Sequence, residues 1–205
     1  MFRPILFNTE MVKALLEGRK TVTRRLVRRK ELGEELSSPA RKENQDIPDR
    51  RFIECLCTAP YEAGDILWVR ETWTLVPDGS YVYKASVECP GAWSGTWRPS
   101  IHMPKEAARI FLKVTDVHAE RLQEITAEGA LDEGTNVEFP EPKPSYISLA
   151  YTKMRLEPAA RRSFANLWDS TIKPADRPVC GWQADPWVWV IRFERCERPE
   201  MGARA

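Results

Sequence analysis

The chain has 205 residues, the length of one domain or of one domain with long insertions. Its 31 Lys and Arg residues against 30 Asp and Glu leave a formal net charge of +1, which excludes a strongly polycationic nucleic-acid coat and a highly acidic disordered chain. Hydrophobic residues make up 42%, enough for a core, and no stretch approaches the roughly 20 apolar residues of a membrane span, so we expect no membrane partner.

The N-terminal residues do not resemble a secretion signal, because Glu10 and Lys13 interrupt any apolar region. We therefore expect a cytoplasmic protein whose five cysteines are reduced and structural rather than paired in disulfides. No two cysteines form a C-x-x-C pair, and the only histidines are His102 and His118. We predict neither a metal nor another cofactor.

A short buried strand over 4–7 and a helix over 9–16 are predicted at the start of the chain. Asn8 or Thr9 can cap this helix, and Gly18 is a natural residue to end it.

Basic residues gather directly after this first helix. The segment 19–30 holds seven of them and no acidic residue, and the polar segment 31–50 that follows carries Pro39 and Pro48. We interpret 31–50 as a mobile loop, because too little chain precedes it to form a separate core.

The rest of the chain contains four further predicted strands and two predicted helices. The strands are apolar or alternating runs over 66–70, 81–85, 110–117 and 186–193. One helix runs over 127–133, capped by Thr126 and ended by Gly134, and the other over 157–169, with Pro158 in its first turn. Short strands without an alternating strand–helix rhythm predict an α+β fold, a small, mostly antiparallel β-barrel with peripheral helices.

Three segments together resemble the ASCH domain family, whose members share a PUA-like β-barrel. They are G-R-K-T-V-T-R-R over 18–25, the Gly-Asp turn and strand that lead to R-E-T-W over 64–73, and I-T-A-E-G-A-L-D-E-G over 125–134. The resemblance implies a single ASCH-like domain over 1–205. The chain is longer than compact members of the family, with insertions near 31–60, 88–104 and 135–185.

Small bacterial N4-acetylcytidine amidohydrolases within this family use a Lys, a Thr three residues later and a Glu. By position, these correspond to Lys20, Thr23 and Glu133. The resemblance implies an amidohydrolase that removes an acyl group from the exocyclic N4 of a cytosine nucleoside. Segments 70–73 and 97–105 are instead similar to phage-associated ASCH proteins, for which the substrate is less defined.

The chemistry of these three residues can be judged separately from the resemblance. On a regular strand Lys20 and Thr23 point to opposite faces, so they meet only if the backbone turns near Gly18. The Thr hydroxyl needs a base, and a neutral Lys amine within hydrogen-bond reach can serve if burial and neighbouring arginines lower its pKa. Glu133 could position the amine or carry a proton to the leaving nitrogen.

We assign Arg25, Glu71 and Trp73 to substrate binding, with Trp73 as a stacking surface for a base. Glu71 could equally be a surface partner of Arg70 or Lys84. Trp187 and Trp189 share one face of the last strand and are predicted to be core.

The alternative function is a PUA-like RNA-binding module or ribonuclease, in which the basic run over 19–30 grips phosphate groups. The nearly neutral net charge argues against tight binding of long nucleic acid, whereas the local basic cluster keeps RNA contact open.

Overall fold

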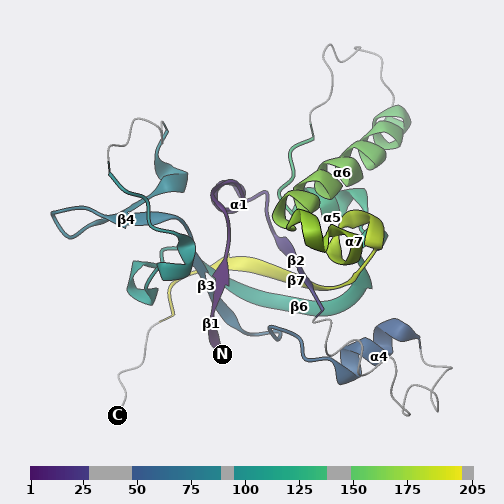
Figure 1. Ribbon diagram of the computed structural model, residues 1–205, viewed down its shortest axis with the longest axis horizontal. Helices are drawn as coiled ribbons and strands as arrows, with labels where there is room; N and C mark the ends of the chain where they lie inside the picture. The colour runs from purple at the N-terminus through teal and green to yellow at the C-terminus, as the bar shows by residue number, and fades with distance from the viewer. Residues whose placement is uncertain (28–47, 89–94, 138–148, 200–205) are drawn as a thin grey trace.

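The computed structural model describes residues 1–27, 48–88, 95–137 and 149–199 (Figure 1). The loop predicted over 31–50 lies outside the described residues as far as residue 47, and so do parts of the two later insertions, 89–94 and 138–148.

A five-stranded mixed sheet forms the centre of the molecule. Its strand order is β1 (Phe2–Leu6), β3 (Ile66–Arg70), β6 (Phe111–Arg121), β7 (Trp187–Cys196) and β2 (Val22–Leu26). Strands β1 and β3 run parallel and the other three pairs are antiparallel. The α+β class and the mostly antiparallel sheet are therefore confirmed.

The predicted barrel is wrong in one respect, because the sheet is not closed. Among the described residues β1 and β2 are its two edges and do not pair with each other. Side chains occupy the outer edge of β1 instead: Tyr61 Oη donates to the Pro4 carbonyl at 2.8 Å, and Arg25 Nη2 to the Leu6 carbonyl at 3.0 Å. Carbonyls two residues apart point to the same side of a strand. These side chains take the positions where backbone N–H groups of β2 would complete a barrel.

Two helices begin at side-chain caps that the sequence predicted. Helix α1 (Thr9–Leu16) begins where Asn8 Oδ1 accepts from the Met11 N–H at 2.9 Å. Helix α5 (Ala127–Asp132) is capped by Thr126, whose Oγ1 accepts from the Gly129 N–H at 3.0 Å.

Helix α6 (Leu149–Thr171) is longer than the predicted 157–169 and contains Pro158 in its interior rather than in its first turn. A proline removes one helical hydrogen bond, and here the helix continues on both sides of it. Helices α5, α6 and α7 (Arg177–Cys180) gather on one side of the sheet, with α4 (Asp49–Leu56) on the other side (Figure 1).

Strands β4 (Trp73–Leu75) and β5 (Tyr81–Tyr83) form a separate hairpin that extends away from the sheet (Figure 1). Strand β5 is shorter than the predicted 81–85, since the chain turns into a 3₁₀ helix after Tyr83. Six such 3₁₀ turns occur in the described chain, at Lys84–Ser86, Ser100–His102, Lys105–Ala107, Leu122–Glu124, Pro174–Asp176 and Trp182–Ala184.

Three clusters of buried side chains hold these layers together. The largest packs α1 and α4 against the sheet and includes Trp187 and Trp189, which confirms their predicted core role. A second joins α5 and α6 to β7 through Phe164 and Trp168. The third packs Trp73 of the hairpin against Met103, Ala107, Ala108 and Phe111.

Candidate active site

The chain between α1 and β2 is held against the C-terminal end of α5. Gly18 has φ +75°, a left-handed conformation that glycine adopts without strain, and turns the chain out of α1. Lys20 then forms an isolated antiparallel bridge with Glu133, and the Thr21 N–H donates to the Asp132 carbonyl at 2.8 Å. Two of the predicted site residues, 113 positions apart in sequence, thus lie side by side.

The Lys20 side chain is completely buried and fully hydrogen bonded. Its Nζ donates to Glu133 Oε2 at 2.7 Å, to the Glu133 carbonyl at 2.9 Å and to the Val22 carbonyl at 2.8 Å. Burial lowers the pKa of Lys20, the Glu133 carboxylate opposes that shift, and the charges of Arg25 and Arg24 lower the pKa further.

Glu133 is the centre of a buried network of alternating charges. Its Oε1 accepts from Arg24 Nη1 at 3.2 Å, and Arg24 Nε donates to Glu120 Oε1 at 2.7 Å. Burial alone would raise the pKa of Glu120, but His118 and Arg24 hold it below its ordinary value. Sequence reasoning missed Glu120 because the predicted strand ended at residue 117, whereas β6 continues to Arg121.

His118 has acidic neighbours that the sequence did not reveal. Its Nε2 lies 3.9 Å from Glu120 Oε2, and its Nδ1 lies 2.6 Å from Asp116 Oδ2. These two carboxylates raise the pKa of His118 above 6.5, against the effect of burial. His118 therefore extends the charge network from Glu133 toward the surface.

Thr23 has a buried hydroxyl, and no described residue is its hydrogen-bond partner. The predicted hydrogen bond between Lys20 and Thr23 is therefore absent, because Glu133 and Val22 already accept all three N–H bonds of the Lys20 ammonium. Thr23 lies on β2 and faces a pocket instead.

This pocket has a volume of about 340 Å³ and is bordered by β1, the start of α1, β2, the end of α5 and α6. Helices α1 and α5 thus border one cleft. Lys20 is not part of the lining, so Glu133 stands between it and the pocket. The lining is formed by Ile5, Leu6, Asn8, Met11, Thr23, Arg24, Arg25, Tyr61, Glu133, Phe164, Leu167, Trp168 and Thr171.

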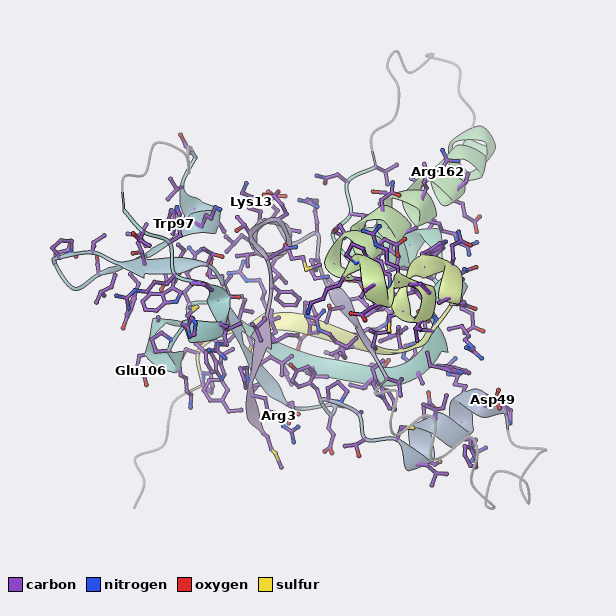
Figure 2. The ribbon with its side chains drawn as sticks, viewed as in Figure 1. Arg3, Lys13, Asp49, Trp97, Glu106 and Arg162 are labelled. Carbon is purple, nitrogen blue, oxygen red and sulfur yellow. The ribbon has the colours of Figure 1, made fainter. Side chains whose placement is uncertain are left out.

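Of the three predicted substrate-binding residues, Arg25 alone lines this pocket. Glu71 is 1% exposed and accepts from Arg109 Nε at 2.8 Å and Nη2 at 2.9 Å, so its partner is neither Arg70 nor Lys84. Trp73 is a buried residue of the hairpin itself, with its ring 5.6 Å from that of Tyr81. The labelled Trp97 also lies on the hairpin side of the molecule (Figure 2).

Of the described members of the basic run, two are buried, whereas Arg25 is half-buried and Arg19 is exposed. Lys20 and Arg24 are buried, and Arg19 Nε donates to Glu17 Oε2 at 2.7 Å. The remaining members, Arg28, Arg29 and Lys30, lie outside the described residues.

Within the described ranges, no group of three or more His, Cys, Asp or Glu side chains is placed to hold a metal ion. None of the helices in the described part of the chain has the length and apolar character needed to cross a membrane.

Comparison with known protein families gave no matching family model, and no curated protein matches the sequence. Among solved structures, the chain is similar to the crystal structure of an ASCH domain from Lactobacillus crispatus JV V101. The sequence identity is 12%, the alignment covers 95% of this chain and 79% of that one, and the TM-score is 0.36.

Proposed function

We propose that this chain is one ASCH-like domain over 1–205 and an amidohydrolase that removes an acyl group from the exocyclic N4 of a cytosine nucleoside. The observation that carries the proposal is the Thr23 hydroxyl, which is buried, has no partner in the described structure and belongs to a residue that lines the pocket. Buried polar groups are nearly always satisfied, and a natural exception calls for an explanation such as a catalytic role. The Lys20–Glu133 pair beside it supplies titratable groups.

In the proposed reaction Thr23 Oγ1 attacks the acyl carbon, and a neutral Lys20 amine accepts the hydroxyl proton. The buried setting supports this role, since desolvation favours the neutral amine. Lys20 is hydrogen bonded to the carbonyl of the peptide that joins Val22 to Thr23. To accept the proton, the amine must exchange one of its present contacts for Thr23.

Collapse of the tetrahedral intermediate then breaks the bond between the acyl carbon and N4. Glu133 lies between Lys20 and the pocket, where it can pass the proton to the departing nitrogen. A water molecule hydrolyses the resulting acyl-threonine ester, which releases the carboxylic acid and restores the hydroxyl. The net reaction consumes one water for each amide cleaved.

The walls of the pocket suit a flat heterocycle. Phe164 and Trp168 give the lining an aromatic part, and Arg25 offers a cation and N–H donors for polar groups of the substrate. The volume of about 340 Å³ is within the range of small-molecule sites. Glu71 and Trp73 do not line this pocket, so we give them no part in binding there.

The test is to incubate the purified protein with N4-acetylcytidine and to quantify cytidine and acetate by mass spectrometry. Thr23→Ala, Lys20→Ala and Glu133→Ala should each lose most of kcat, with losses far from additive because the three groups act as a unit. Thr23→Ser should keep part of the activity. Thr21→Ala is the matched control, since Thr21 is exposed and two residues away.

Two outcomes would change the assignment. Activity in Thr23→Ala together with an inactive Lys20→Ala would make a water molecule the nucleophile. Normal hydrolysis by all three alanine variants would place the site elsewhere. A parallel incubation with a short RNA tests the alternative function, and cleavage or retention of that RNA without any cytidine release would favour an RNA-binding module or ribonuclease.

A further inference from the structure

A second pocket lies next to the first, and Arg25 and Tyr61 line both. Its volume is about 410 Å³, and it occupies the other part of the gap between the edge strands β1 and β2. Figure 2 shows Arg3, one of its lining residues, near the N-terminal end of β1. The full lining is Arg3, Arg25, Leu26, Thr58, Ala59, Pro60, Tyr61 and Trp189.

The charge of this second pocket is one-sided. Two of its lining side chains are arginines, two carry hydroxyl groups, and none is acidic. In the first pocket, by contrast, the Glu133 carboxylate lies among the lining residues. The Tyr61 hydroxyl already donates to the Pro4 carbonyl, so Thr58 supplies the hydroxyl donor of this pocket. A site with two cations, a hydroxyl donor and no carboxylate favours an anion over a neutral or positively charged group.

Arg25 has binding capacity that its neighbour Arg24 lacks. Arg24 is bound to two carboxylates, those of Glu120 and Glu133. Arg25 donates to two backbone carbonyls, of Leu6 at 3.0 Å and Arg24 at 3.3 Å, and has no carboxylate within ion-pair distance among the described residues. A guanidinium carries five N–H donors, so the described residues leave three of them for a ligand.

Arg3 forms the other charged wall. Its Nη1 donates to the Pro60 carbonyl at 3.1 Å, which holds the side chain against the pocket, and its Nε lies 3.6 Å from Asp65 Oδ2. Asp65 is itself bound by the Met1 amino group and by the Glu62 N–H. One carboxylate is thus shared by two cations, which leaves the charge of Arg3 only partly compensated.

We propose that this second pocket binds the phosphate of a nucleotide whose acylated cytosine occupies the first pocket. A ligand that fills both pockets needs a flat uncharged end and an anionic end, and a nucleoside monophosphate has both whereas a free nucleoside lacks the anion. Arginine forks match phosphate oxygens in geometry and charge. This inference rests on the proposed function for its substrate class, but it can be tested without catalysis.

The binding test compares cytidine, cytidine 5′-monophosphate and inorganic phosphate as ligands of the wild-type protein by calorimetry. The monophosphate should bind at least about ten-fold more tightly than cytidine, because hydrogen bonds to charged groups contribute about 1.5 to 3 kcal/mol and 1.4 kcal/mol is a factor of ten. Inorganic phosphate should compete with the monophosphate. Equal affinities for the nucleoside and the nucleotide would overturn the inference.

Variants locate the phosphate. Arg3→Gln and Thr58→Val should each reduce affinity for the monophosphate by about five-fold or more and leave cytidine binding unchanged. Arg51→Gln removes the same charge from an exposed position on α4 and should have no effect. Thermal unfolding checks that each variant folds, and Thr58→Val remains informative if Arg3→Gln does not. A phosphate preference that survives both variants would overturn the assignment to this pocket.

Kinetics separate this inference from the proposed function. If the protein hydrolyses N4-acetylcytidine and its 5′-monophosphate with equal kcat/KM, the proposed amidohydrolase activity is supported and the proposed phosphate site is refuted. If it hydrolyses neither compound but binds the monophosphate through Arg3, the proposed phosphate site is supported and the proposed reaction is refuted. A short RNA that binds more tightly than the monophosphate would overturn the inference in favour of an RNA ligand.

Discussion

Replacing Glu133 by Gln removes the one carboxylate that binds both Lys20 and Arg24. The Lys20 side chain is 0% exposed and does not line the pocket, so its ammonium gains no water in exchange. Breaking a buried pair by removing one partner costs about 3 to 5 kcal/mol. Arg24 keeps its bond to Glu120, so we expect the lower end, about 3 kcal/mol, carried mainly by Lys20. For a chain of this length, that corresponds to a fall in Tm of about 6 to 12 °C.

Urea unfolding of the wild type, Glu133→Gln, Lys20→Met and the double variant measures this directly. Glu133→Gln leaves the buried Lys20 ammonium without its carboxylate partner, and Lys20→Met removes that ammonium. The double variant should therefore cost less than the sum of the two single changes, by about 1 kcal/mol or more. Glu17→Gln is the matched control, since Glu17 pairs with Arg19 at the surface and exposed pairs contribute little. If Glu133→Gln costs no more than Glu17→Gln and the cycle is additive, the buried pair does not stabilise the fold as argued.

Three further predictions concern titration and packing. Burial lowers the pKa of Lys20 below its usual 10.5, so between the folded and the unfolded pKa the folded chain binds fewer protons than the unfolded chain. The free energy of unfolding of the wild type should therefore rise relative to that of Lys20→Met as the pH rises toward 10.5, and a constant difference would contradict this. Neighbouring carboxylates raise the pKa of His118 above 6.5, so the contribution of protonated His118 to the free energy of unfolding should be complete below pH 6.5 and lost as the pH rises through the folded pKa. An NMR titration midpoint of His118 at or below 6.5 would refute the shift. Gly134→Ala places a methyl carbon 2.7 Å from a side-chain carbon of α1, whereas Gly79 has a similar positive φ and open space around it. In urea unfolding, Gly134→Ala should cost about 1 to 3 kcal/mol more than Gly79→Ala, and equal losses would show that only the backbone conformation matters.

Local patterns were sufficient for most of the secondary structure. Helices α1 and α5 begin at Asn8 and Thr126 because a side-chain oxygen binds a nearby backbone N–H, and that interaction depends on a few adjacent residues. Strands β3 and β7 follow from apolar runs in the same way. The predicted ranges for α6 and β6 were too short. A proline near the start of the predicted helix, and polar residues on both faces at the end of the predicted strand, resemble the ends of such elements.

The candidate site was only partly predictable. The resemblance in segments 18–25 and 125–134 pointed to Lys20, Thr23 and Glu133. The structure brings Lys20 and Glu133 into contact, and Thr23 and Glu133 both line one pocket. The sequence did not show that Glu133, rather than Thr23, accepts the Lys20 hydrogen bond. That choice depends on which acceptors the fold places around one buried ammonium.

Long-range partners were decided by the tertiary structure alone. Arg109 as the partner of Glu71, Glu120 as the partner of Arg24, and Tyr61 on the open edge of β1 all join residues far apart in the chain. Spacing along a sequence constrains only neighbours within a turn or a strand. Whether the two edge strands pair or leave a gap depends on the curvature of the whole sheet and on the side chains between them, and here that gap holds both pockets.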